Sequence, residues 1–337
     1  MNCQPFYERI NVLNEYDDHE KRSRTRFAMN TFRVLVADSI GEDGIRILRE
    51  AGLQVDLRFE IIHEELKRII PDYDAIIVRS RTRVDSDVIE KGRRLKTIGR
   101  AGVGLDNIDV EAATSRGITV YNTPEALSTA VAELTIGLML SLARQIPMAD
   151  RTMKEGRWLK KDLTGFELKG KTIGILGFGN IGTEVGRLAR GLGMKILVHT
   201  HDPIDPNILL ELNAREVPHE ELLEESDVLT IHIPLSRESH HVIGREELSM
   251  MKPGAYLINT SRGGVVDEKA LCEAVKGGRL AGAALDVFEE EPQCKSELVT
   301  LDRVICTPHI GAQTEEAQKS ASSIIARKVI NYLQAKG

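Results

Sequence analysis

Short apolar, β-rich runs alternate with amphipathic stretches along almost the whole chain, and this alternation is the strongest constraint on its fold. The first series of strand-like runs lies at Phe32–Ala37, Asp74–Val78, Thr97–Ile98 and Ile118–Tyr121. A second series lies at Thr172–Leu176, Lys195–His199, Val228–Ile233, Ala255–Ile258 and Val304–Cys306. Strands separated by helices form βαβ units with a parallel sheet. The two series predict the α/β fold class, with two Rossmann-like, doubly wound parallel-sheet domains.

Between the two series lies a long helix-like segment, from Ala130 to Met153. Pro147 falls inside it and predicts a break or kink, because proline removes a backbone donor. Its dense apolar face fits either a core helix or a subunit interface. A final helix is expected from Glu315 to Leu333.

A glycine loop lies between the strand-like run that ends at residue 176 and the helix expected after it. Gly177, Gly179 and Gly182 form the pattern GxGxxG, with Asn180 and Ile181 opening the helix. The first glycine permits a tight turn, the second lets the backbone approach a pyrophosphate, and the third lets helix and strand pack closely. In this strand–loop–helix context the motif predicts a dinucleotide site.

The expected acidic residue that would select NAD is displaced. The first carboxylate after the second strand is Asp202, about 20 residues beyond the last loop glycine. Thr200 stands where the strand ends, so the pattern favours NAD but does not exclude NADP.

Composition excludes several classes of protein. The net charge is −6 and aromatic residues make up 4%, which provides neither the basic field nor the stacking platform of a nucleic-acid-binding protein. The four cysteines show no metal-binding or disulfide spacing, so no metal is expected and a reducing, cytoplasmic setting is predicted. The apolar runs are too short to cross a membrane. Residues 1–30 are predicted to form a polar extension.

Four ionisable residues follow late strand-like runs: Arg262, Asp286, Glu291 and His309. In an open α/β sheet, ligands bind beyond the carboxyl ends of the strands, where these side chains would converge. A histidine beside a carboxylate can exchange the hydroxyl proton of an alcohol, and an arginine can bind a substrate carboxylate. The set fits hydride transfer to or from a 2-hydroxy acid.

Together with this set, several further motifs resemble the D-isomer-specific 2-hydroxyacid dehydrogenases over about residues 32–335. The matching segments are Arg79–Thr82, Gly102–Asn107, Leu142–Gln145, the glycine loop, Asn259–Gly263, Leu285–Pro292 and Pro308–Gly311. Within the family the similarity is greatest to the branch that oxidises 3-phosphoglycerate to 3-phosphohydroxypyruvate, the first step of serine biosynthesis. The regulatory modules of many such enzymes are absent after residue 337, so feedback inhibition by serine is not expected.

The resemblance implies a role for each candidate residue. Arg262 would orient the substrate, His309 would act as the base and Glu291 would pair with it. Asp286 would contact the nicotinamide, and Thr260 would also line the coenzyme site. The loop at Gly102, Val103 and Gly104 is by itself best explained as a simple turn. The resemblance instead implies that the Val103 and Gly104 amides bind the substrate carboxylate, while Arg79, Ser80 and Arg144 contact a substrate phosphate.

The resemblance also implies that the substrate-binding domain is discontinuous. It would comprise residues 31–122 and 310–337, with the NAD-binding domain, 123–309, inserted between them. A homodimer is expected, with the long helix at its interface. Two alternatives stay open: a hydroxypyruvate/glyoxylate reductase or another D-2-hydroxyacid dehydrogenase on the same scaffold, and, more distantly, an NAD-sensing corepressor that binds protein partners.

Overall fold

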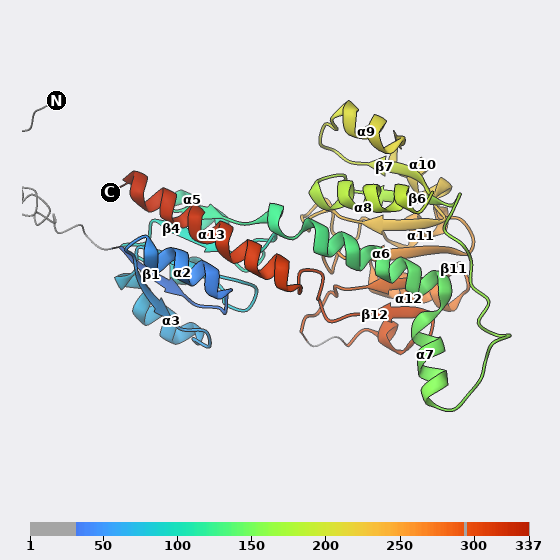
Figure 1. Cartoon of the computed structure of the whole chain (residues 1–337), viewed down its shortest axis with the longest axis horizontal. Coiled ribbons are helices and arrows are strands. Elements are labelled where there is room, and N and C mark those ends of the chain that lie inside the picture. The colour runs from blue at the N-terminus through green and yellow to red at the C-terminus, as the bar shows by residue number, and fades with distance from the viewer. Residues whose placement is uncertain (1–31, 293–294, 337) are drawn as a thin grey trace, which may run out of the picture.

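Two parallel sheets form the molecule, one on each side of a central seam (Figure 1). The computed structural model describes residues 32–292 and 295–336, so the extension predicted over residues 1–30 lies outside the described residues. The first sheet has the strand order β2-β1-β3-β4-β5 and the second has the order β12-β11-β10-β9-β6-β7-β8. The predicted fold class is therefore confirmed.

The first sheet is short-stranded and covered on both faces. Its strands are β1 (Arg33–Val36), β2 (Gln54–Leu57), β3 (Ala75–Val78), β4 (Thr97–Arg100) and β5 (Thr119–Tyr121). Helices α2 (Glu42–Glu50), α3 (His63–Ile69), α4 (Ser86–Lys91) and α5 (Val110–Ser115) connect them, with a short 3-10 turn at Ile70–Asp72. Because side chains alternate along a strand, Val34 packs into one core and Leu35 into the other.

The second sheet carries the glycine loop. Its strands are β6 (Thr172–Leu176), β7 (Lys195–His199), β8 (Ala214–Glu216), β9 (Val228–Ile231), β10 (Ala255–Asn259), β11 (Leu280–Leu285) and β12 (Val304–Cys306). Its connecting helices are α8 (Asn180–Gly191), α9 (Pro206–Leu212), α10 (His219–Glu225), α11 (Arg245–Met250) and α12 (Glu268–Lys276), and a 3-10 turn at Glu297–Thr300 precedes β12.

The long segment between the sheets is two helices rather than one. After a 3-10 turn at Pro124–Ala126, α6 runs over Ser128–Arg144 and α7 over Ile146–Lys154. The break falls at Gln145, which has a φ of 53°, two residues before Pro147. Pro147 has no backbone N–H to donate to residue 143 and its ring would clash there, so it is tolerated only in the first turn of a new helix, and the break falls just before that turn. Among the described residues no single helix is long and apolar enough to cross a membrane; the bent pair α6–α7 would meet that test on length and composition alone.

The last helix, α13 (Glu315–Lys336), lies on the first sheet although it follows the second sheet in sequence (Figure 1). It packs against α2 and β4. Gly44 permits this contact, because a Cβ there would lie 2.6 Å from the Ser322 carbonyl oxygen. The Gly41 amide also donates to the Ser322 hydroxyl at 2.7 Å. The chain therefore passes from the first sheet to the second after β5 and returns after β12.

Candidate active site

The glycine loop leaves the carboxyl end of β6 and enters α8. Gly177 has a φ of 91°, and a Cβ there would lie 2.6 Å from the His232 carbonyl oxygen. A Cβ at Gly182 would clash with the carbonyl oxygen of Gly177, whereas one at Gly179 would meet open space. Glycine is thus required for folding at 177 and 182, and at 179 it leaves the approach to the helix N-terminus open for a ligand.

This loop fits the pyrophosphate of a dinucleotide. Gly179 precedes α8, so Asn180 and Ile181 form the first turn and the free amides of that turn face the open side. Beside the loop, the buried Nδ1 of His232 has no hydrogen-bond partner among the described residues, and burial lowers the pKa of this histidine to about 3. A neutral ring with an unsatisfied nitrogen is consistent with a ligand at this position.

The position directly after β7, where a carboxylate that selects NAD would be expected, carries the hydroxyl of Thr200. Leu176 pairs with His199, so Thr200 lies level with the start of the glycine loop. The Thr200 hydroxyl accepts a hydrogen bond from the Asp202 amide at 3.3 Å, and the Asp202 side chain is exposed. The two positions that the sequence left open are thus joined in one turn.

Two residues that were predicted to contact the coenzyme make hydrogen bonds to other residues of the protein. The Thr260 hydroxyl lies 2.9 Å from that of Thr135 on α6. Asp286 is 1% exposed and accepts hydrogen bonds from the Thr307 hydroxyl and from the backbone amides of Ile310 and Gly311, at 2.6–2.8 Å. Its carboxylate therefore fixes the segment that carries His309, and its predicted contact with the nicotinamide stays a prediction.

The predicted acid–base pair is assembled. His309 Nδ1 lies 2.7 Å from Glu291 Oε2, and Glu291 Oε1 accepts from the Phe288 amide at 2.9 Å. Burial raises the pKa of Glu291, but the hydrogen bonds from His309 and Phe288 and the charge of Arg262 outweigh burial and hold it below its ordinary value. Glu291 is therefore ionised at neutral pH and holds Nδ1 of His309, so that this contact does not involve the Nε2 atom of the ring.

Arg262 lies on the loop after β10 and reaches the first sheet. Its Nε donates to Asp106 Oδ2 at 2.9 Å and its Nη1 donates to the Ser261 carbonyl at 2.6 Å. Its Nη2 lies directly over Gly104, where any Cβ would clash with it. The predicted carboxylate-binding amides and the predicted substrate-orienting arginine therefore come together.

Arg100 is a site residue that sequence reasoning missed. It ends β4, and its guanidinium packs on Gly102 as that of Arg262 packs on Gly104. Burial, and then the positive charges of Arg262 and Arg79, lower its pKa to about 10, with Asp106 opposing them. Its Nε is buried without a partner among the described residues. A sequence signal was present, because a charged residue lies two positions before the first glycine of the Gly102–Gly104 pair.

A clamped loop presents Arg79 and Ser80 at the end of β3. Asp38, which is 3% exposed, accepts from the Arg79 amide at 2.6 Å and from the Thr82 hydroxyl at 2.6 Å. Asn107 donates to the carbonyls of Arg79 and Thr82 from the other side, at 2.8 and 2.6 Å. Burial lowers the pKa of Arg79, opposed by Asp38.

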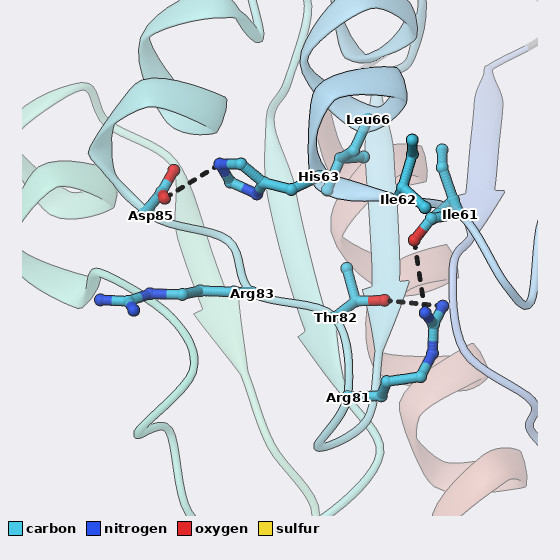
Figure 2. A pocket seen from close by; sticks show the side chains of 8 residues that line it. All are labelled: Ile61, Ile62, His63, Leu66, Arg81, Thr82, Arg83 and Asp85. Carbon is cyan, nitrogen blue, oxygen red and sulfur yellow. Dashed lines mark hydrogen bonds and ion pairs between the residues drawn. The ribbon is translucent and has the colours of Figure 1, made fainter.

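The guanidinium of Arg81 binds a main-chain carbonyl and a buried carboxylate of the first lobe. Figure 2 shows its guanidinium turned toward the Ile61 carbonyl, which it reaches at 3.3 Å, while Arg83 extends away from it. Arg81 also pairs with Asp38 at 3.3 Å. Arg79 is thus the member of this loop whose charge adds to that of Arg100 and Arg262.

Arg144 is not brought to this cluster within one chain. It ends α6, next to Leu142 and Gln145, which line a cavity together with Tyr256 and Val304 at the amino ends of β10 and β12. The candidate site lies at the carboxyl ends. From Thr135, which touches Thr260, α6 extends about 14 Å further before Arg144. Within one chain Arg144 does not reach the candidate site from this position, and its predicted phosphate contact stays a prediction.

The comparisons with known proteins agree with this geometry. Residues 136–311 match the family described as D-isomer specific 2-hydroxyacid dehydrogenase, NAD binding domain. A D-3-phosphoglycerate dehydrogenase of Methanocaldococcus jannaschii is 49% identical over 90% of this chain and 57% of its own length. A hydroxypyruvate reductase of Thermotoga maritima is 44% identical over 90% of this chain and 99% of its own length.

Solved structures give the same result. A glyoxylate reductase from Paecilomyes thermophila is 32% identical with a TM-score of 0.85, over 91% of this chain and 97% of that one. The chain spans a little over half the length of the phosphoglycerate dehydrogenases it matches, for example 57% of the Methanocaldococcus protein. Fold, glycine loop and relatives lead to one conclusion: the chain belongs to the D-isomer specific 2-hydroxyacid dehydrogenases, which bind NAD.

Proposed function

We propose that the protein interconverts 3-phosphoglycerate and 3-phosphohydroxypyruvate with NAD. The observation that carries the proposal is the convergence of three arginines, Arg79, Arg100 and Arg262. The guanidinium groups of Arg100 and Arg262 pack on Gly102 and Gly104, and, after burial, the charges of Arg262 and Arg79 lower the pKa of Arg100. A substrate with both a carboxylate and a phosphate can neutralise such a cluster, because guanidinium groups bind both anions as bidentate partners. A hydroxy acid with one carboxylate needs fewer cations.

The proposed mechanism assigns one task to each side of the cleft. The Val103 and Gly104 amides and Arg262 would hold the substrate carboxylate, and Arg79 and Ser80 would hold the phosphate. During oxidation, His309 takes the proton of the substrate hydroxyl on the ring nitrogen that Glu291 does not hold. Bound NAD supplies the acceptor for the hydride that leaves the same carbon. The resulting imidazolium is stabilised by ionised Glu291.

We also propose that the two lobes follow the boundaries expected from the sequence. The substrate-binding domain would be 31–122 with 310–337, and the NAD-binding domain 123–309. Support comes from α13, which packs on α2, and from the glycine loop and the His309–Glu291 pair, which all lie on the second sheet.

A homodimer is part of the proposal. The α6–α7 end of the second lobe exposes the large apolar side chains Leu140, Ile146, Met153 and Trp158, the last at 76%. A second copy that covers this end would bury them and would bring Arg144 toward a partner's cleft.

The free thiol of Cys272 fits the reducing cytoplasm that we propose as the protein's location. Small acids, rather than nucleic acid or membrane, are the proposed partners.

Hydroxypyruvate reduction is the second candidate, since the Thermotoga relative of that name matches over its whole length. Both reactions are tested by one panel: 3-phosphohydroxypyruvate, hydroxypyruvate and glyoxylate, each with NADH and NADPH. We expect kcat/KM to be at least about 100-fold higher for the phosphorylated acid, since two lost charged contacts cost about 3 kcal/mol or more. Preference for hydroxypyruvate would support the second candidate, and coenzyme binding without turnover would favour the corepressor.

A further inference from the structure

Asp106 is an acidic side chain in the middle of the arginine cluster, and nothing in the proposed reaction uses it. It lies on the loop between β4 and α5, and its side chain is 57% exposed. A negative charge at this place repels an anionic substrate, so its presence needs a compensating role. Its contacts indicate one.

The first contact is the salt bridge with Arg262, which joins the first lobe to the second. Arg262 has three nitrogen positions, and two of them are occupied: Nε by Asp106 at 2.9 Å and Nη1 by the Ser261 carbonyl at 2.6 Å. Nη2 is left facing the Gly104 backbone. The two occupied positions fix the plane of the guanidinium, so that its remaining edge points at the amides proposed for the substrate carboxylate.

The second contact is with Gly104 itself. A Cβ at position 104 would clash with both the Arg262 guanidinium and the Asp106 carboxylate. Glycine is therefore what lets these two side chains meet over the loop. Its φ is not in the left-handed region, so the requirement comes from close approach rather than from backbone conformation.

Asn107, the residue after Asp106, connects this loop to the loop that carries Arg79. Asn107 holds the loop of Arg79 and Thr82 through their carbonyl oxygens, at 2.8 and 2.6 Å. Consecutive residues thus bind the two groups that would contact opposite ends of the substrate: Asn107 binds the Arg79 loop, and Asp106 binds Arg262.

We infer that Asp106 is a positioning residue, which holds the Arg262 guanidinium across the cleft in the orientation that receives the substrate carboxylate. The inference rests on the proposed role of Arg262. An exposed ion pair of this kind contributes only about 0–1 kcal/mol to stability, so its removal should leave the fold intact. Misplacing a substrate-binding group by about 1 Å, in contrast, can cost about 100-fold in rate.

The test compares Asp106→Ala and Asp106→Asn with a control, Glu211→Ala, which removes the same type of contact from Arg187 Nε at 3.1 Å, far from the cleft. We expect Asp106→Ala to lower kcat/KM about 10- to 100-fold, equally for 3-phosphohydroxypyruvate and glyoxylate, since both carry the carboxylate. The Kd for NADH and the Tm should stay at wild-type values. Asp106→Asn, which keeps an acceptor for Nε, should recover most of the loss.

Unchanged or improved kcat/KM in Asp106→Ala would overturn the inference, because Asp106 would then be neutral or obstructive. Equal impairment of Asp106→Asn and Asp106→Ala would overturn the hydrogen-bond role. Arg262→Ala separates the inference from the proposed function: full turnover in Arg262→Ala refutes the role of Arg262 itself. If Arg262→Ala is inactive while Asp106→Ala is normal, only the inference fails. The double variant should be no worse than Arg262→Ala, since the two act as a unit.

Discussion

Two glycines of the coenzyme loop look equivalent in sequence but carry different constraints in the structure. Gly182 packs against the Gly177 carbonyl and has no room for a methyl group, whereas Gly179 borders open space. Gly179→Ala should therefore fold with an unchanged Tm but bind NADH at least about tenfold more weakly, because the methyl group occupies the ligand side. Gly182→Ala should lose about 1–3 kcal/mol of unfolding free energy, as in other overpacked sites.

Fluorescence titration with NADH and thermal unfolding separate the two effects. Loss of stability in Gly179→Ala, or normal stability in Gly182→Ala, would contradict the assignment of one glycine to binding and the other to packing.

Replacement of His309 tests its proposed role as the catalytic base most directly. His309→Ala should lower kcat about 100- to 10,000-fold, the usual contribution of a proton-transfer group. Its Kd for NADH should stay within about twofold of wild type, because the hydrogen bonds of His309 among the described residues go to Glu291 and Thr307 and not to the glycine loop, and NADH binding does not use proton transfer. Glu291→Gln, which keeps the side chain's shape but removes the charge, should have a kcat between those of the wild type and His309→Ala. Retained turnover in His309→Ala would place the base elsewhere.

The candidate site was largely predictable from residue order, except where packing decides. His309 and Glu291, 18 positions apart, are joined at 2.7 Å as the sequence predicted. Arg100 was missed because its strand was expected to end at Ile98, which left Arg100 in a turn. Its packing on Gly102 depends on rotamer and burial, and these are set by neighbours that are distant in sequence. Arg144 shows the converse: a matching motif does not fix which cleft a side chain can reach.

At the scale of elements, the strands that sequence missed share a physical reason. β11 reads Leu-Ala-Gly-Ala-Ala-Leu, without a single β-branched or aromatic residue, and is formed because β10 and β12 pair with it on both sides. β2 and β8 are edge strands whose residues are exposed or half-buried, so neither contains the continuous apolar run by which a strand is recognised in sequence. Propensity is a weak signal where tertiary pairing determines the conformation.

Asp227 lies where β6, β9 and β10 of the second sheet begin, and its contribution to the free energy of unfolding should depend on pH. Its carboxylate accepts from the Thr172 amide at 2.8 Å and pairs with Lys252 at 3.2 Å. Burial raises its pKa, but these two partners outweigh burial and the pKa is lowered. A lowered pKa stabilises the fold above the unfolded-state value, about 3.9, and this stability is lost as the pH falls through the folded-state value.

Asp227→Asn should therefore cost about 1.5–3 kcal/mol at neutral pH, the contribution of a charge-assisted hydrogen bond. Urea unfolding of both proteins, repeated from about pH 7 down to about pH 3, measures the difference. The gap between the two should narrow only below about pH 4. A gap that is independent of pH would mean that the ionised carboxylate is not the stabilising form.

For the whole molecule, the exposed apolar end of α6 and α7 predicts self-association. Met153 is 54% exposed there, and a charge at this place in a buried interface would be left unpaired. Met153→Glu should therefore shift the protein from dimer to monomer, as measured by sedimentation or by light scattering. A wild-type protein that sediments as a monomer at micromolar concentration would refute the dimer. Turnover with glyoxylate should survive in the monomer better than turnover with 3-phosphohydroxypyruvate, if Arg144 acts on a partner's substrate.

The placement of α13 sets an order of events during synthesis. The face of the first sheet that holds Val34 and Val36 is completed by Ala321, Ile325 and Val329 of this helix. Those residues are translated only after every strand of the two sheets that the structure describes, so the first sheet keeps one face uncovered during synthesis while the second sheet packs against its own helices. Domains usually fold in the order in which they are made. Here the lobe whose synthesis begins first completes its folding last, and its uncovered apolar face needs protection from aggregation until α13 has been made.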